Sequence, residues 1–279
     1  MEWVNLFLWT NFLYNMKYIH SMWSAPAMKN EFDIDFLLRN FYLYLLSVLL
    51  IKKHGHKIEL FCDKQAYEIY SMIPYDNIHI TDFGSDGISK IFWIWAKIKA
   101  QMLMDEPYVH IDGDVLMFRD IIGNKLETGQ YSAVVQSTEN PKTIGDWYDR
   151  TYTRTANPYL KWNDKYNIDW NKYGAAYNCG VVGFSDMKLK HQYLDTVKNL
   201  LVDLSNDPTF QYDGNKYGGI FMLTEQAYLY YLLKEKNIEP FEIIPLEEIV
   251  KCDYDWYFKV PKNLGYCHML GPSKYKSNV

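Results

Sequence analysis

The chain has 279 residues, of which 48% are hydrophobic and 23% charged, and its formal net charge is −5. This length and composition favour a single folded domain over residues 1–279 and argue against a disordered chain. The negative charge offers no basic footprint for DNA or RNA, so we expect no nucleic-acid partner.

The N-terminal segment, residues 1–15, is apolar but too short to span a bilayer, and Asn5 and Asn11 interrupt it. It also lacks the basic start and the cleavage site of a signal peptide. We interpret it as an N-terminal extension that packs on the domain. Two alternatives stay open. One is an interfacial anchor that gives peripheral membrane contact, and the other is natural translation from Met16, at the start of a predicted first strand.

The first half of the chain alternates between strand-like and helix-like patterns, which predicts a mostly parallel sheet covered on both faces. The first long helix is closed by basic residues and Gly55, a usual C-terminal signal. Strands are expected at about 17–22, 57–62, 77–81 and 108–111, and helices at 33–53, 64–72 and 89–104.

The alternation weakens in the second half. Residues 138–172 are rich in Trp, Tyr, Asn and Asp without clean periodicity, which is typical of a substrate-side insertion. No linker or internal repeat interrupts the chain. Further strands are expected at 132–136, 176–184 and 241–244, and further helices at 187–205 and 223–236.

The cysteines are widely spaced and form no Cys-x-x-Cys pair, so neither a structural zinc site nor a disulfide framework is indicated. A reducing compartment is the simpler inference. We therefore expect a cytoplasmic protein, with membrane association through the apolar N-terminus left open. The four cysteines are Cys62, Cys179, Cys252 and Cys267.

Asp-x-Asp occurs three times, at residues 33–35, 112–114 and 253–255. Only Asp112-Gly113-Asp114 follows a strand-like apolar run, at the carboxyl end where open α/β sheets bind ligands. The glycine between the acids permits close backbone approach to a ligand. Two such carboxylates can hold a hard divalent cation, a downstream imidazole such as His268 can complete its coordination, and Lys274 can neutralise a phosphate.

An ordered series of motifs resembles the GT-A glycosyltransferases, most closely glycosyltransferase family 8. The series spans residues 97–274 and is fairly specific in order and spacing. Its members are Ala96-Lys97-Ile98, Asp112-Gly113-Asp114, Asn178-Cys179-Gly180-Val181-Val182-Gly183, Glu225-Gln226 and His268-x-x-Gly271-x-x-Lys274. Two departures occur: Tyr275-Lys276 replaces the family's Pro-Trp, and Glu225 stands where Asp is usual.

The resemblance implies a GT-A type α/β fold, a Rossmann-like mixed sheet with helices on both faces. It implies retaining transfer of a hexose from a UDP-sugar to a glycan or glycolipid acceptor, and by family analogy a role in surface polysaccharide synthesis. Asp112, Asp114 and His268 would bind Mn²⁺ or Mg²⁺. Donor and cofactor contacts would come from Lys97, Asp112, Gly113, Asp114, Gly180, Gly271 and Lys274. Asn178 and Gln226 would be catalytic.

Two other functions stay open. The run from Tyr108 to Val115 also fits the first motif of haloacid-dehalogenase-like phosphatases, with Asp112 as nucleophile and Asp114 as general acid. These enzymes need a later acidic cluster, and no Asp-Asp pair follows here. A non-catalytic sugar-nucleotide-binding protein is the second alternative, although such a protein has no need for a complete metal site.

Each candidate also has a purely structural interpretation. His268 can be an ordinary packed or surface histidine, and Lys97 a solvent-facing lysine on an amphipathic helix. Asn178 can satisfy buried backbone, and Lys274 can belong to a solvated basic tail. His110, inside the predicted strand, is expected to be a packed residue and not a ligand.

Overall fold

The computed structural model describes residues 16–27, 34–140, 165–169, 172–207, 223–245, 247–248 and 264–269. The predictions for residues 1–15, for Gly271 and Lys274, and for most of the insertion at 138–172 lie outside these residues. All other candidate site residues lie within them.

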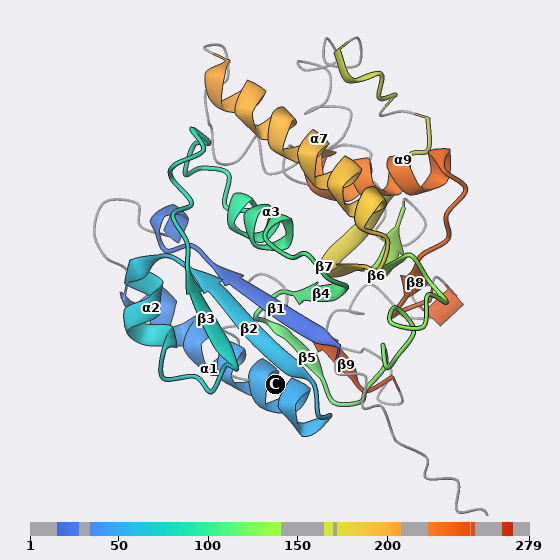
Figure 1. The fold of residues 1–279 in the computed structure, drawn as a ribbon. Coiled ribbons are helices and arrows are strands. Elements are labelled where there is room, and N and C mark those ends of the chain that lie inside the picture. The colour runs from blue at the N-terminus through green and yellow to red at the C-terminus, as the bar shows by residue number, and fades with distance from the viewer. Residues whose placement is uncertain are drawn as a thin grey trace, which may run out of the picture.

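A seven-stranded sheet forms the centre of the molecule (Figure 1), with strand order β3-β2-β1-β4-β7-β6-β8. The strands from β3 to β4 are parallel, β7 is antiparallel to both β4 and β6, and β8 is parallel to β6. The predicted α/β class with a mixed, Rossmann-like sheet is therefore confirmed. The strands are β1 (Lys17–Met22), β2 (Lys57–Cys62), β3 (Asn77–Ile80), β4 (Tyr108–Ile111), β6 (Ala133–Glu139), β7 (Ala176–Phe184) and β8 (Phe241–Glu242).

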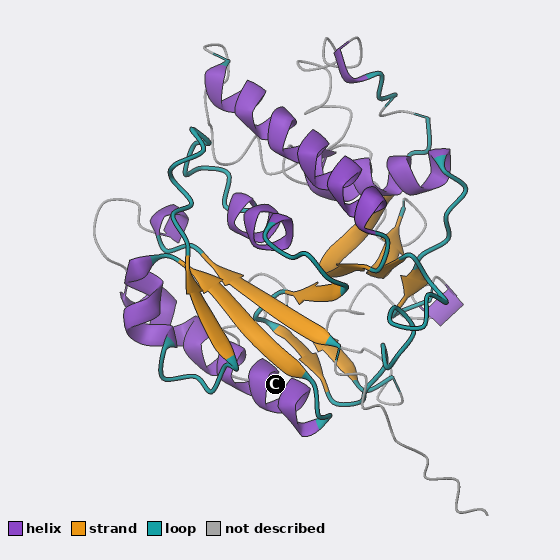
Figure 2. Cartoon of the chain, in the orientation of Figure 1, coloured by secondary structure: helices purple, strands orange, loops and turns teal. Residues whose placement is uncertain are grey.

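Helices lie on both faces of this sheet, as predicted (Figure 2). One face carries α1 and α2, and the other carries α3, α7 and α9. Two short helical segments, η1 and η3, lie before α1 and before α9. Their bounds are η1 (Ala25–Ala27), α1 (Ile34–Lys53), α2 (Lys64–Tyr70), α3 (Trp95–Met102), α7 (Met187–Asn206), η3 (Leu223–Ala227) and α9 (Tyr228–Glu235).

The two helical layers enclose separate hydrophobic cores, and the central strands supply both. Successive side chains of a strand point to opposite faces. Tyr18 and Leu60 accordingly lie in the core below α1, while Ile19 and Phe61 lie in the core below α3 and α7. Burial on both faces explains why these strands show no regular alternation of apolar and polar residues.

The helix predicted at 89–104 is shorter than expected, because α3 begins only at Trp95. The residues before it form turns, in which Phe92 N donates to Ser89 O and Trp95 N donates to Phe92 O. Ile88 and Phe92 are buried there without being helical. Their apolar spacing reflects burial of a turn, so the prediction that the helix begins at Ser89 is wrong.

A second, two-stranded sheet was not predicted. It pairs β5 (Val115–Met117) antiparallel with β9 (Tyr266–His268). Both strands have three residues, too short for a period-two pattern to stand out. Smaller differences occur elsewhere: β6 continues to Glu139, and the helix predicted at 223–236 starts with a π-helical turn, η3.

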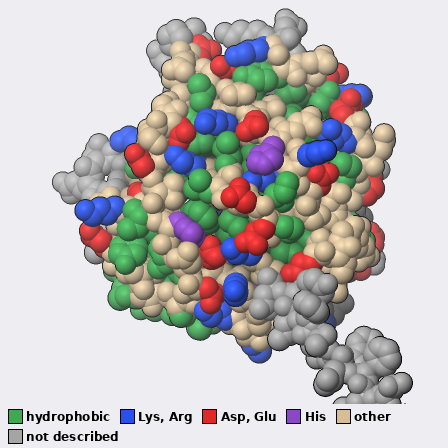
Figure 3. Space-filling model, viewed as in Figure 1, with side chains coloured by type: hydrophobic (Ala, Val, Ile, Leu, Met, Phe, Trp, Pro, Cys, Tyr) green, Lys and Arg blue, Asp and Glu red, His purple; other side chains and the backbone are tan. Residues whose placement is uncertain are grey.

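On the face shown in Figure 3, acidic and basic side chains are interspersed among apolar ones. Charge is therefore not concentrated in a single-sign patch on that face. Within the described parts of the chain, no helix has the length and hydropathy needed to cross a bilayer. Cys62, Cys179 and Cys267 are free thiols.

Candidate metal centre

The Asp112-Gly113-Asp114 turn connects β4 to β5, and the backbone holds it on both sides. Asp112 N donates to Gly180 O of β7 at 2.8 Å, and Val115 N donates to Asp112 O at 2.9 Å. The sheet thus places both carboxylates at the carboxyl end of β4. This is the position predicted from the apolar run that precedes them.

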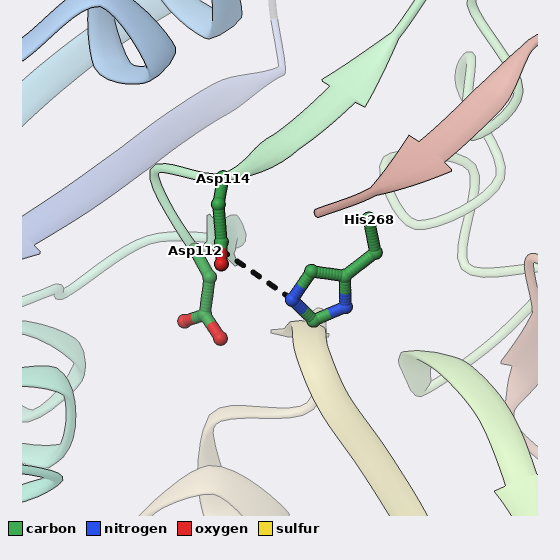
Figure 4. Close-up of side chains that lie close together, drawn as sticks. All are labelled: Asp112, Asp114 and His268. Atoms are coloured by element: carbon green, nitrogen blue, oxygen red, sulfur yellow. Dashed lines mark ion pairs between the residues drawn. The ribbon is translucent and has the colours of Figure 1, made fainter. Parts of the chain in front are cut away.

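The second sheet delivers His268 to the same place. Val115 and His268 are paired in register, and Met269 N donates to Asp114 O at 2.9 Å. His268 Nε2 then lies 3.4 Å from Asp114 Oδ1 (Figure 4). Ligand atoms of Asp112, Asp114 and His268 all lie within 4.8 Å of one another. The structure therefore brings together the three residues predicted to bind a metal.

The chemistry of this donor set fits a hard or borderline divalent cation. Two carboxylate oxygens and an imidazole nitrogen are suited to Mn²⁺, and carboxylates are suited to Mg²⁺. The side chains are sheltered, with 29% of Asp112, 11% of Asp114 and 5% of His268 exposed. Two neighbouring carboxylates repel one another in such a setting, and a bound cation offsets that repulsion.

Lys97 enters this centre from α3 and contacts three protein groups there. Its Nζ lies 3.1 Å from Asp112 Oδ1 and 3.0 Å from Glu225 Oε1, and it donates to Cys179 O. Burial lowers the pKa of this ammonium, but the charges of Asp112 and Glu225 outweigh it, so the pKa is raised and Lys97 stays charged. The solvent-facing interpretation is wrong, and contact with a donor stays a prediction.

Glu225 and Gln226 lie in the π-helical turn η3, a conformation often found at functional sites. Glu225 is fully buried; burial raises its pKa, and Lys97 opposes that shift. Gln226 is half-buried next to it. The ion pair with Lys97 links this turn to the Asp112 carboxylate, so η3 is coupled to the candidate centre. The catalytic role of Gln226 stays a prediction.

Asn178 stabilises the strand that faces the centre. Its Nδ2 donates to Glu139 Oε1 at 2.7 Å, and its Oδ1 accepts from Gly180 N at 2.9 Å. These bonds satisfy buried polar groups of β6 and β7, as the structural interpretation of Asn178 expected. Its predicted catalytic role stays a prediction.

Gly180 itself leaves room for a side chain of the centre. A Cβ at this position would lie 2.4 Å from His268 Cε1. The absence of a side chain therefore allows the imidazole to pack directly on β7. The predicted contact of Gly180 with a donor is neither supported nor opposed by this observation.

His110 is a packed residue, as expected. It is buried in β4, and its Nε2 lies 3.0 Å from the Ser21 hydroxyl. Burial, with the charge of Lys97, lowers its pKa well below the ordinary value. His20 behaves alike, and burial lowers its pKa to about 3. Both rings are therefore neutral in the folded protein at neutral pH.

Gly113 is required for a reason that the sequence did not reveal. A Cβ at Gly113 would lie 2.0 Å from Cε2 of Tyr44, a buried ring of α1 whose hydroxyl donates to Ser21 O. The close approach seen in the structure is thus to this ring. We expect Gly113→Ala to lower the free energy of unfolding by about 1–3 kcal/mol, as overpacking does, measured by urea denaturation.

The matched control for this substitution is Gly84→Ala, whose Cβ would have ordinary contact with Asp82 Oδ1 at 3.4 Å. In a Tyr44→Leu background the cost of Gly113→Ala should largely disappear, because the clashing ring is gone. An equal cost in both backgrounds would rule out the clash as its cause.

Sequence reasoning thus located the three candidate metal ligands but missed the residues that support them. Tyr44 resembles any other aromatic residue of a buried helix. Gln136 gave no distinct signal either, because Ser137, Thr138 and Glu139 follow it in β6 and are polar too.

Fold and site together define an α/β protein with a two-carboxylate, one-histidine centre at a strand end. The chain belongs to a protein family of unknown function, DUF6734, whose model matches residues 16–279. No curated protein sequence matches the chain.

Three solved structures show a distant likeness. The apo structure of the bifunctional glycosyltransferase WbbM has 11% identity and a TM-score of 0.40, over 76% of this chain and 38% of that one. The galactosyltransferase LgtC, in complex with donor and acceptor sugar analogues, has 14% identity and a TM-score of 0.39, over 75% of this chain and 72% of that one. A glycosyltransferase involved in glycosylation of the major capsid of PBCV-1 has 11% identity and a TM-score of 0.35, over 92% of this chain and 95% of that one. The activities in those names belong to those proteins, and likeness at this level carries no conclusion about this chain.

Proposed function

We propose that this protein is a metal-dependent glycosyltransferase of GT-A type. It transfers a hexose from a UDP-sugar to a glycan or glycolipid acceptor, with retention of configuration, in the synthesis of a surface polysaccharide. The observation that carries the proposal is the convergence of Asp112, Asp114 and His268 from distant parts of the chain. These are the residues that the motif series assigns to the metal.

The residues have separate tasks in this proposal. Asp112, Asp114 and His268 hold Mn²⁺ or Mg²⁺. When bound, the cation offsets the negative charge that builds on the diphosphate as UDP leaves. Lys97 fixes the Asp112 carboxylate and ties it to Glu225. Gln226, next to Glu225, is the residue we assign to the reacting face of the sugar.

Calorimetric titration of UDP into the protein, with Mn²⁺ and again with EDTA, tests the nucleotide site. We expect binding with Mn²⁺ and its loss in EDTA, because the two carboxylates would otherwise repel the diphosphate. Inorganic phosphate is the matched control ligand, since it lacks the nucleoside.

Absence of UDP binding under both conditions would contradict the proposal. Turnover of an aryl phosphate that disappears in Asp112→Asn would instead establish the phosphatase alternative. UDP-sugar binding with no hydrolysis or transfer, over a broad acceptor panel, would establish the binding protein. With binding and turnover in hand, the anomeric configuration of the product by NMR decides whether transfer is retaining.

A further inference from the structure

Gln136 of β6 contacts the imidazole of His268 at the ring nitrogen that faces away from the carboxylates. Its Oε1 lies 2.7 Å from His268 Nδ1 and 2.7 Å from the Tyr266 hydroxyl. Figure 4 shows the other ring nitrogen, Nε2, directed toward Asp114. Gln136 has no exposed surface, and His268 is 4% exposed, so water does not compete for this contact.

We propose that Gln136 is a positioning residue for the metal centre, a role that rests on the metal-dependent function proposed above. Gln136 Oε1 accepts a hydrogen bond from the N–H at His268 Nδ1. A neutral imidazole carries one ring proton, and an acceptor at one nitrogen leaves the lone pair on the other. Gln136 therefore selects the tautomer whose Nε2 can bind a cation beside Asp112 and Asp114.

The Tyr266 hydroxyl donates to the same oxygen of Gln136 that faces His268. A carboxamide oxygen has two lone pairs and can accept from both the Tyr266 hydroxyl and His268 Nδ1. Tyr266 and His268 are two residues apart in β9 and project from the same face of that strand. With the amide reversed, its N–H would donate to Nδ1, the ring proton would lie on Nε2, and Nε2 would have no lone pair for a cation.

The backbone of β6 and its neighbours positions Gln136 for its contact with His268. The β6–β7 register shifts between Val135 and Ser137, which makes Gln136 the residue at the irregularity. Such irregularities redirect a side chain out of the regular pleat. On the facing strand, a Cβ at Gly180 would lie 2.4 Å from Gln136 Oε1. Ile244 N donates to Gln136 O at 2.8 Å and anchors the residue from the other side.

The test measures Mn²⁺ binding and the His268 tautomer, neither of which requires turnover. Titration of Mn²⁺ alone should show a loss of roughly 10–100-fold in affinity for Gln136→Leu, the usual effect of removing an outer hydrogen-bond partner. Gln136→Glu keeps an acceptor oxygen and should bind Mn²⁺ more tightly than Gln136→Leu.

The matched control is Gln101→Leu. Gln101 is likewise a buried glutamine that accepts from a tyrosine hydroxyl, that of Tyr108 at 3.1 Å, but it lies on α3 and makes no described contact with the centre. Its replacement should leave Mn²⁺ affinity unchanged. If Gln136 only filled the core, Gln136→Leu would change the free energy of unfolding as Gln101→Leu does, and Mn²⁺ affinity would stay unchanged.

The tautomer is read from ¹⁵N-histidine NMR of the wild-type protein in EDTA, where the neutral His268 ring should carry its proton on Nδ1. A neutral ring with its single proton on Nε2, or wild-type Mn²⁺ affinity in Gln136→Leu, overturns the inference. If Gln136→Leu does not fold, the wild-type tautomer still decides it. Absence of Mn²⁺ binding by the wild type would instead contradict the metal-dependent function, and the tautomer would separately decide the role of Gln136.

Discussion

Replacing Asp114 with alanine is expected to weaken Mn²⁺ binding by more than roughly 100-fold, because even partners behind a metal ligand typically contribute 10–100-fold. The substitution removes one of the three converging ligand groups and leaves only Asp112 and His268 to bind the cation. Mn²⁺-dependent UDP binding should disappear with it. Calorimetry with Mn²⁺, and then with UDP in the presence of Mn²⁺, measures both effects.

Two controls separate this loss from unfolding. Asp105→Ala removes an exposed acid that precedes β4 and should change neither titration. Asp114→Asn keeps the size of the side chain, and the backbone bond from Met269 N to Asp114 O is retained in either variant. We expect Asn to bind Mn²⁺ more weakly than Asp, since a neutral amide oxygen lacks the charge of a carboxylate. Wild-type Mn²⁺ and UDP binding in Asp114→Ala would remove Asp114 from the metal site.

The position of the two aspartates was predictable because it depends on local sequence. A buried run followed by polar residues marks the end of a strand, and ligands of open sheets bind there. The same reasoning gave the bounds of β7 correctly. It relied on neighbouring residues alone, without any knowledge of which strands pair.

The surroundings of the site were not predictable in this way, since they depend on long-range pairing. His268 reaches Asp114 through the register of β5 with β9, and neither strand is long enough to show a pattern. Resemblance to a family assigned His268 to the site; periodicity did not. Gln136 contacts His268 from the point where the β6–β7 register shifts, and a single sequence does not reveal such an irregularity.

Lys97 illustrates the same limit, because its helical position is also compatible with a solvated lysine. In the structure it is 4% exposed and forms ion pairs with Asp112 and Glu225. These partners come from β4 and from η3, two elements that share no local sequence. A buried ammonium between two acids links the turn at Asp112–Asp114 to the turn that carries Gln226.

Replacing Lys97 with methionine should therefore destabilise the fold by about 3–5 kcal/mol, the usual cost of leaving a buried charge unpaired. Methionine nearly matches the length of the lysine chain but carries no charge, so the Glu225 carboxylate and its neighbour Asp112 would repel one another without compensation. Urea denaturation at neutral pH measures the change. Adding Glu225→Gln should restore much of the lost stability, because it removes the uncompensated charge.

Lys99→Met is the matched control for this prediction, on the same helix. Lys99 also forms an ion pair, with Asp86, but at a more exposed site where 17% and 20% of the two side chains are accessible. Its replacement should cost about 1 kcal/mol or less. If Lys97→Met were as stable as Lys99→Met, or if Glu225→Gln gave no recovery, the buried ion pair would not be what joins η3 to the turn at Asp112–Asp114.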